Sequence, residues 1–551
     1  MSVLQKKWEI LNQSNRTAIE KVLSNRQNIL DLETVSLHDP FLFEQMDRAV
    51  KRITDAIEYQ ELIVIFGDYD VDGITAAATL IKVLRKLNAK LEYRLPNRMH
   101  DGYGLSNKFI DQFIEKEVKL LITVDCGISC AEQIAHAKAN GIDTIITDHH
   151  NIPAQIPDAY AILHPKHNSS YPCSELTGSG VAFKLAEALI KTHFPAAEQG
   201  QQIDALLELA CMGTIADMGA LHGENRLIVQ RGLRGLNQTK SPGLRALKKV
   251  SNISEGQPMT ASSIGFQLGP RINAAGRIGD PYIALELLIR EEQDSQTENL
   301  AAELESLNLQ RRDLTDLAIA SAAQRIDPLA PPALIIEHSS DWHTGILGLI
   351  AGKLAEKYAR PTIIMQDLGD TLVASARSPE FFNIVEAITA CGKYLISFGG
   401  HAQAAGLTLK KSQLPDFEKA MTAYTEAALS QLDPKPTLRI DCEIRGDEIS
   451  AAFLSQLSAL EPFGIGNSQP TFVIRDAVVD FPEQIGKDKS HLKFTLNTDS
   501  QKIKVIAFRM GEFCPALMSS PKIDLVFTIE KNYWNGREYL GLQALDFQIK
   551  G

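Results

Sequence analysis

The sequence predicts an α/β protein: a parallel-sheet domain joined by a long helix to a second α/β domain, with a small β-barrel behind them. Two observations predict the α/β part. Apolar runs of strand length alternate with segments of helical spacing, and the alternation resumes after a long charged segment that lacks glycine. A third observation predicts the barrel, because apolar runs beyond residue 437 are short and rich in β-branched and aromatic residues.

The first α/β domain is expected over residues 46–289, after a polar, helix-prone extension over residues 1–45. Its strands and helices alternate, which favours a parallel sheet covered on both faces. In chain order the segments are LIVIFG (62–67), ITAAATLIKVLRKL (74–87), KLLITVDCG (119–127), DTIITDHH (143–150), AYAILHP (159–165) and GSGVAFKLAEALI (178–190).

The second half of the chain divides into three parts. Residues 290–330 end in NLQRRDLTDLAIASAAQRI and are expected to form a connecting helix. Strand and helix alternate again over residues 331–432, from ALIIEH to TLVASARS and beyond. The stretch QLDPKPT marks a boundary, and about five β-rich runs over residues 433–551 fit a barrel of the OB type.

Composition predicts a folded cytoplasmic protein. With 551 residues and 44% apolar content, the chain is long enough for roughly three to four domains. Its seven cysteines include no C-x-x-C pair, which argues against a disulfide framework or a structural zinc site. MSVLQKKWEI lacks the apolar core of a secretory signal, and no segment has the roughly 20 apolar residues that span a membrane.

The net charge of -12 is unusual for a protein that binds nucleic acid, because affinity for phosphate comes from lysine and arginine. It does not exclude a nuclease. A nuclease needs only a locally positive groove, and carboxylates that hold metal ions add negative charge which the ions neutralise.

Acidic and imidazole side chains follow three of the predicted strands. Asp68, Asp70 and Asp72 follow the first, Asp125 the second, and the triplet 148–150 (Asp-His-His) the third. A lone aspartate at such a place is usually a helix cap or a turn residue. Three strand ends of this kind converge at one edge of a parallel sheet, however, where carboxylates repel unless cations are present. The pattern therefore predicts a site for Mg²⁺ or Mn²⁺.

These motifs carry a family resemblance. GDYDVDG, VDCG and TDHH resemble the ordered motifs of the DHH phosphoesterases, and GTIAD (213–217) resembles their fourth motif. Five later motifs narrow the resemblance to the RecJ family, which degrades single-stranded DNA from the 5′ end: PRINAAGR (270–277), DWHTGILGLIAGKLAE (341–356), SARS (375–378), FGGHAQAAG (398–406) and LEPFGIGN (460–467). The resemblance covers about residues 50–551 and implies a DHH domain, a DHH-associated domain and an OB-like domain.

The resemblance implies two metal ions and the residues that hold them. Asp68 would bind one ion and Asp70 the other, Asp125 would bridge both, and His149 with Asp217 would complete the second site. His150 would face the scissile phosphate or the attacking water, so His150, Asp125 and Asp72 are the predicted catalytic residues, with Asp72 and Asp148 orienting ligands. Many relatives carry a histidine just ahead of the first aspartate, where this chain has Val64 and Phe66, which implies a weaker first site.

The resemblance also implies residues that hold DNA. Arg98, Ser375 and Arg377 match positions that hold a terminal 5′ phosphate, for which a guanidinium is well suited. Arg271, Asn273 and Arg277 would line the DNA path, and His401 would contact the substrate beside two glycines. A surface ion pair for Arg98, a turn at Gly276 and a core histidine at 401 are the alternatives.

The barrel is expected to bind the single strand by base stacking and backbone charge. Its aromatic residues alternate with lysine and arginine, although some of them must fill the barrel core; they are Phe472, Phe481, Phe494, Phe508, Tyr533, Trp534 and Tyr539.

The prediction is thus a two-metal 5′ to 3′ exonuclease for single-stranded DNA in recombination and repair. The alternatives are a DHH phosphodiesterase for short oligonucleotides or cyclic dinucleotides, and a DNA-binding scaffold without activity. The resemblance implies single-strand binding protein and a RecQ-like helicase as partners, and no membrane.

Overall fold

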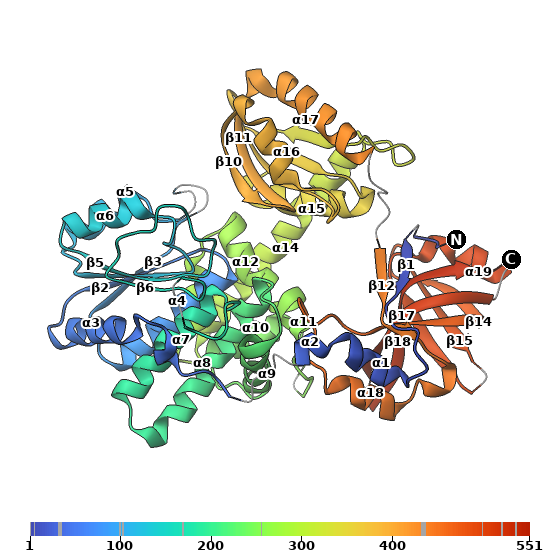
Figure 1. The fold of residues 1–551 in the computed structure, drawn as a ribbon, viewed down its shortest axis with the longest axis horizontal. Helices are drawn as coiled ribbons and strands as arrows, with labels where there is room; N and C mark the ends of the chain where they lie inside the picture. The colour runs from blue at the N-terminus through green and yellow to red at the C-terminus, as the bar shows by residue number, and fades with distance from the viewer. Residues whose placement is uncertain are drawn as a thin grey trace. The chain divides into compact units, whose positions relative to one another are not determined.

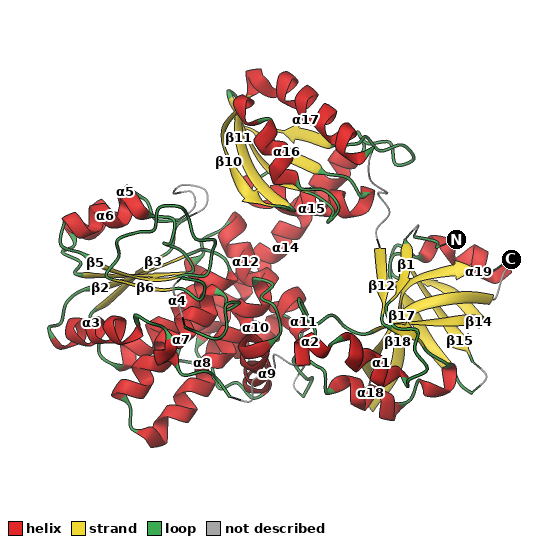
Figure 2. Ribbon diagram, viewed as in Figure 1, coloured by secondary structure: helices red, strands yellow, loops and turns green. Residues whose placement is uncertain are grey.

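The computed structural model describes residues 2–4, 6–30, 36–97, 101, 104–167, 170–254, 256–430, 437–498, 500–519, 522–534 and 537–550. Two compact units make up the chain (Figures 1 and 2). The catalytic unit comprises residues 34–219 and 224–434, and the barrel unit comprises residues 1–33, 220–223 and 435–551. Among the described residues, no helix is both long enough and apolar enough to cross a membrane.

The first sheet of the catalytic unit is five-stranded and wholly parallel, in the order β3-β2-β4-β5-β6. Its strands are β2 (Ile63–Gly67), β3 (Leu91–Arg94), β4 (Leu120–Val124), β5 (Asp143–Thr147) and β6 (Ala161–Leu163). Every residue of β2 and β4 is buried, as expected for a sheet that is covered on both faces. The predicted parallel sheet is confirmed, with β3 as an additional short strand.

Helices cover both faces of this sheet (Figure 1). On one face, α5 (Asn107–Glu115) and α6 (Ala131–Ala139) pack Phe109, Phe113 and Ile134 against strand residues. On the other face lie α3 (Met46–Glu58), α4 (Val71–Lys86) and α7 (Gly178–His193), preceded in the chain by the 3₁₀ turn η1 (Pro40–Leu42).

A helical layer follows the sheet in the chain and ends in the longest helix. It contains α8 (Ala196–Ala216), α9 (Gly223–Asn237), α10 (Pro242–Val250), α11 (Ala261–Ser263), the π-helix η2 (Ile264–Leu268), α12 (Gly269–Ile278), α13 (Tyr282–Ile289) and α14 (Ser295–Ala323). Asp294 caps α14, accepting a hydrogen bond from the Thr297 amide at 2.9 Å. The long charged helix predicted between the two α/β parts is confirmed, because α14 packs on α12 and α13 and then on α15 (Leu347–Tyr358).

The second sheet is mixed, in the order β10-β11-β9-β8-β7. Its strands are β7 (Ile335–Ser339), β8 (Thr362–Asp367), β9 (Thr371–Arg377), β10 (Leu395–His401) and β11 (Ala404–Lys410). Its flanking helices are α15, α16 (Ile384–Ala390) and α17 (Leu414–Leu429), with 3₁₀ turns η3 (Thr344–Ile346), η4 (Gly392–Tyr394) and η5 (Lys411–Gln413). This is the second α/β part that the sequence predicts.

The barrel unit contains a closed barrel in which β14 pairs with both β15 and β17. Its neighbouring strands are antiparallel, except that β16 and β18 are parallel. Its five long strands are β14 (Thr471–Ile485), β15 (His491–Asn497), β16 (Lys502–Ala507), β17 (Lys522–Trp534) and β18 (Arg537–Ile549). Smaller elements are β12 (Thr437–Ile440), β13 (Cys442–Glu443), η6 (Gly446–Glu448), α18 (Ala451–Ser458), η7 (Gly511–Phe513) and α19 (Cys514–Ser519). The OB-like barrel is confirmed.

The N-terminal residues are part of the barrel unit. Strand β1 (Lys7–Ile10) pairs in parallel with β12, and two helices follow it, α1 (Ala18–Asn25) and α2 (Gln27–Leu30). The Arg26 guanidinium forms a buried ion pair with Asp441 beside this sheet. The sequence predicts a helical extension over residues 1–45, whereas the structure adds a strand and groups residues 1–33 with the barrel.

Candidate metal centre

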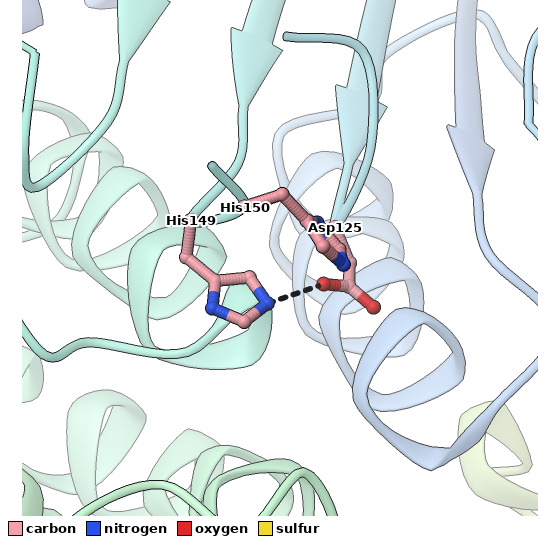
Figure 3. Close-up of side chains that lie close together, drawn as sticks. All are labelled: Asp125, His149 and His150. Carbon is pink, nitrogen blue, oxygen red and sulfur yellow. Dashed lines mark ion pairs between the residues drawn. The ribbon is translucent and has the colours of Figure 1, made fainter. Parts of the chain in front are cut away.

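Acidic and imidazole side chains meet at the carboxyl edge of the first sheet. They form three overlapping groups, and within each group the possible ligand atoms lie within 4.8 Å of one another: Asp68, Asp70 and Asp125; Asp72, His149 and Asp217; Asp125, His149 and His150. Figure 3 shows the His149 imidazole pointing at the Asp125 carboxylate, with Nε2 3.2 Å from Oδ1. All five predicted metal ligands, with Asp72 and His150, are therefore brought together.

Local backbone rules place the first strand's carboxylates. Asp70 is the N-cap of α4, and one of its oxygens accepts the Gly73 amide at 3.1 Å. A Cβ at Gly73 would lie 2.6 Å from the Asp68 carbonyl oxygen, so only glycine lets helix and strand end come this close.

Asp125 stands directly after β4 with φ of 58°, in the left-handed region that side chains other than glycine rarely adopt. A Cβ at Gly178 would collide with its carboxylate, so α7 begins against this side chain. A strained aspartate with so little space around it indicates a position fixed for function.

The site fits a divalent cation. Asp125 is 2% and Asp72 is 1% exposed. Among the described residues, Asp72 Oδ2, Asp125 Oδ1 and His149 Nε2 are buried without a hydrogen bond of acceptable geometry. Unsatisfied buried acceptors are costly, and a cation would satisfy all three. The donor set is mostly oxygen, as Mg²⁺ and Mn²⁺ prefer.

Burial and then mutual repulsion raise the pKa of three carboxyl groups of the cluster, those of Asp70, Asp125 and Asp217. Burial, followed by the charges of Asp72 and Asp70, raises the pKa of Asp217 to about 8. Burial and neighbouring carboxylates raise the pKa of Asp125 well above its ordinary value, and burial lowers the pKa of His149. Without a cation, these groups cannot all take the charge states of metal ligands.

The turn after β5 holds His150 in a fixed direction. Asp148 Oδ1 accepts the His150 amide at 3.1 Å and lies 2.8 Å from His150 Nδ1, while Oδ2 accepts the Ile128 amide at 2.9 Å. Burial opposes protonation of His150, but the bond to Asp148 and nearby carboxylates outweigh it and raise its pKa to about 9. His150 is thus oriented as a cationic group facing the cluster.

Two residues that sequence analysis missed hold Asp72. Its Oδ1 accepts the Ser179 amide at 3.0 Å and the Thr177 hydroxyl at 3.2 Å, both at the start of α7. The GSGVAF segment was the available signal, but its pattern predicts only the start of a helix and not a support for an acidic side chain.

Val64 and Phe66, at the positions where the resemblance led us to expect a histidine, belong to the apolar core. Phe66 is fully buried in β2, and its ring packs against Phe109 with centroids 5.2 Å apart. The group formed by Asp68, Asp70 and Asp125 therefore has carboxylate ligands only, among the residues that the structure describes.

The predicted DNA-binding residues of α12 are engaged with protein groups. Arg271 is 8% exposed and pairs with Glu305 at 2.5 Å, and its guanidinium also donates to the Gln267 carbonyl. Asn273 accepts the Val71 amide at 3.3 Å, which fixes the start of α4 between Asp70 and Asp72. Arg277 donates to the Gly345 carbonyl at 3.1 Å, which ties α12 to the second α/β part.

The second sheet carries the remaining predicted contacts. Ser375 and Arg377 lie side by side on β9, with Arg377 Nη1 3.2 Å from the Ser375 hydroxyl, and both approach Gly348 of α15. His401 ends the exposed strand β10, after Gly400 with φ of 150°. Arg98 lies outside the described residues.

The structure sorts most of the barrel aromatics that sequence could not. Phe472 and Phe494 lie in the barrel core, whereas Phe481, Phe508 and Tyr539 are 79%, 49% and 49% exposed. Phe508 also packs its ring against His491. The side chains at 533 and 534 lie outside the part of the chain whose side chains the structure describes.

Comparison with known proteins gives a consistent match over the whole chain. Family models match at residues 62–214 (DHH family, N-terminal domain), 331–427 (DHHA1 domain) and 440–546 (RecJ OB domain). The single-stranded-DNA-specific exonuclease RecJ of Haemophilus influenzae is 32% identical, with 96% of both chains covered.

Two further matches agree. RecJ of Bacillus subtilis is 36% identical over 94% of this chain, which spans 65% of that relative's length. The crystal structure of RecJ from Thermus thermophilus in complex with Mn²⁺ matches 99% of this chain and 80% of its own, with a TM-score of 0.82 and 25% identity.

Proposed function

The chain belongs to the RecJ family of single-stranded-DNA-specific exonucleases, and from this we propose that it hydrolyses the phosphodiester bonds of single-stranded DNA from the 5′ end. The observation that carries the proposal is the convergence of carboxylates and imidazoles, among which Asp72 Oδ2, Asp125 Oδ1 and His149 Nε2 are buried without a hydrogen bond of acceptable geometry. The enzyme is a metal-dependent hydrolase that uses Mg²⁺ or Mn²⁺, and it acts in DNA recombination and repair.

The ligands divide between two ions. Asp68 and Asp125 would hold the first ion, and Asp70, His149 and Asp217 would hold the second, with Asp125 shared by both. When bound, a pair of ions activates water and stabilises charge on the attacking and leaving oxygens. Asp125 belongs both to the cluster with Asp68 and Asp70 and to the cluster with His149 and His150, which supports its bridging role.

Three residues complete the catalytic set. Asp148 holds His150 Nδ1, so that Nε2 of His150 is the nitrogen left to face the scissile phosphate. Asp72 is fixed by Thr177 and Ser179, and its Oδ2 lies 3.9 Å from His149 Nε2, where its charge would help to orient the second group of ligands. With the ions bound, the shared carboxylate of Asp125 would help to order the attacking water.

Substrate contacts come from the second sheet and from α12. Ser375 and Arg377, with Arg98, hold the 5′ phosphate, for which two guanidinium groups and a hydroxyl offer several donors. His401 contacts the strand from β10. Arg271, Asn273 and Arg277 act on the DNA path mainly by fixing its walls, since protein groups already occupy them.

The barrel supplies contacts to the bases of the single strand. Phe481, Phe508 and Tyr539 offer exposed rings for stacking, and Lys493 and Lys504 lie on neighbouring strands with side chains that reach solvent. Stacking of this kind does not require base identity.

Digestion of end-labelled single-stranded DNA tests the proposal. A 5′-phosphorylated strand, the same strand without the phosphate, a duplex and a dinucleotide are compared in Mg²⁺, in Mn²⁺ and in EDTA. We expect release of nucleotides from the 5′ end of the long strand, faster with the phosphate and abolished by EDTA. Turnover confined to the dinucleotide, or equal turnover of duplex, would refute the proposal.

The cellular setting is proposed on chemical grounds. All seven cysteines are buried thiols without a disulfide, as in a reducing compartment, so we place the enzyme in the cytoplasm. Single-strand binding protein and a RecQ-like helicase are the proposed partners, because the substrate must be unwound and kept unpaired. The five-part division at residues 45, 289, 330 and 432 remains our prediction for how these tasks are distributed.

A further inference from the structure

A buried histidine lies behind the turn that carries His150. His164 directly follows β6 and is 1% exposed. Strand β6 pairs in parallel with β5, and the Asp148 amide donates to the Leu163 carbonyl at 3.2 Å. His164 is therefore next to the Asp148–His150 turn, although its segment AYAILHP (159–165) predicts only a strand.

The contacts of His164 define its tautomer. The Lys166 amide donates to His164 Nδ1 at 3.1 Å, so this nitrogen carries the lone pair. His164 Nε2 lies 2.8 Å from the His150 carbonyl oxygen, which can only accept. One neutral tautomer, with its proton on Nε2, satisfies both contacts, and burial lowers the pKa of His164 and so favours the neutral ring.

His150 is thus held at its ring, its amide and its carbonyl group. Asp148 binds the amide and fixes the imidazole through Nδ1, and His164 fixes the carbonyl group of the same residue. Either contact alone leaves a rotation available: the ring can turn about its side-chain bonds, or the peptide can tilt and carry the ring with it. Together they define the direction of Nε2 of His150.

We propose that His164 is a positioning residue for hydrolysis: its Nε2–H holds the His150 carbonyl and thereby aims the His150 imidazole at the bond to be cut. The proposal rests on the function proposed above for His150. Displacement of a catalytic group by about 1 Å costs on the order of a hundredfold in rate, so one hydrogen bond behind the turn is enough to matter.

A purely structural role gives a different expectation. His164 also closes the turn over residues 164–167, where its Nδ1 accepts the Lys166 amide and its carbonyl accepts the His167 amide at 3.1 Å. Asparagine can keep the first bond, because its Oδ1 lies where Nδ1 does, but it is too short to reach His150. Glutamine can reach His150 with its amide nitrogen but does not place an acceptor at the Nδ1 position.

The test compares His164→Gln, His164→Asn and His164→Leu in the full chain. We expect Asn and Leu to lower kcat on 5′-phosphorylated single-stranded DNA about 10- to 100-fold, with KM and Mn²⁺ stoichiometry nearly unchanged, and Gln to recover most of kcat. Thermal unfolding is measured for each variant. If the Asn variant is as active as wild type while the Gln variant is impaired, the contact with the Lys166 amide is the important one, and the proposal is overturned.

A double-mutant cycle separates this proposal from the role of His150. In a His150→Ala background, His164→Leu should cause no further loss of kcat, because His164 acts through His150. An equal loss in both backgrounds overturns the positioning role. Full activity of His150→Ala alone would instead refute the function proposed for His150.

Discussion

Replacing Asp125 by asparagine should abolish activity and stabilise the metal-free protein. Asparagine keeps the shape of the side chain and tolerates the left-handed backbone that Asp125 adopts with φ of 58°. The change therefore removes the charge, while the shape of the side chain and the backbone conformation stay the same. Because Asp125 is 2% exposed and surrounded by other carboxylates, its charge destabilises the folded state when no cation is bound.

The expected magnitudes follow from the burial of this charge. A buried charge without a partner costs several kcal/mol, and proton uptake limits that cost, so asparagine should add about 2 kcal/mol to the free energy of unfolding in EDTA. This corresponds to a rise of a few degrees, roughly 2–4 °C per kcal/mol, in the unfolding temperature. Loss of the shared ligand should reduce kcat by about a thousandfold or more, or at least about 4 kcal/mol of transition-state stabilisation.

Thermal unfolding in EDTA and in saturating Mn²⁺, with kcat measured in parallel, tests both expectations. The variant should unfold above wild type in EDTA and below it in Mn²⁺, since metal binding stabilises only the protein with intact ligands. Asp158→Asn is the matched control, because its side chain is 81% exposed. The same order of stability in both buffers would refute the reasoning, as would wild-type turnover by the variant.

Three further predictions concern other charges and rings. Burial and neighbouring carboxylates raise the pKa of Asp217 from 3.8 to about 8. The protonated carboxyl group therefore stabilises the folded state below about pH 4, and this stabilisation is lost as the pH rises to about 8. The unfolding temperature in EDTA should fall across this pH range, and it should fall less for Asp217→Asn. Phe481→Ala and Phe508→Ala should each weaken binding of a long single strand by about 5- to 100-fold, as measured by fluorescence anisotropy. The control is Tyr59→Ala, which removes a comparably exposed ring from the catalytic unit and should leave binding unchanged. Arg26→Ala should lower the free energy of unfolding of the barrel unit by about 3–5 kcal/mol in denaturant titrations, because it leaves a buried carboxylate unpaired, and an unchanged midpoint would contradict this.

Sequence alone predicts the parts of this fold that depend on local pattern. The fully apolar run before Asp68 becomes a strand buried on both faces, and the glycine-free charged segment becomes α14. Strand β3 was missed because LEYR is four residues long and carries two charges. Convergence of the strand ends was predictable because parallel strands share one edge.

Contacts between distant segments were not predictable from sequence. Strand β1 pairs with β12 more than 400 positions away, and no local signal in KWEI indicates its partner. The consequence is practical: removing residues from about 437 onward also leaves β1 without its partner strand and Arg26 without its ion-pair partner. A truncation that tests the barrel must therefore remove residues 1–33 as well, because an exposed β1 edge would otherwise invite aggregation.

The local and the functional interpretations of an aspartate at a strand end are compatible, as Asp70 illustrates. One of its oxygens caps α4 through the Gly73 amide, and the same side chain belongs to a metal-binding group. A carboxylate has more lone pairs than a cap needs, so the cap fixes its orientation and leaves a second oxygen for the ion. Asparagine at this position would keep the cap but lose the charge, so fold and metal affinity respond differently to one substitution. Cap-forming residues after buried strands are therefore candidate ligands wherever several strand ends carry them.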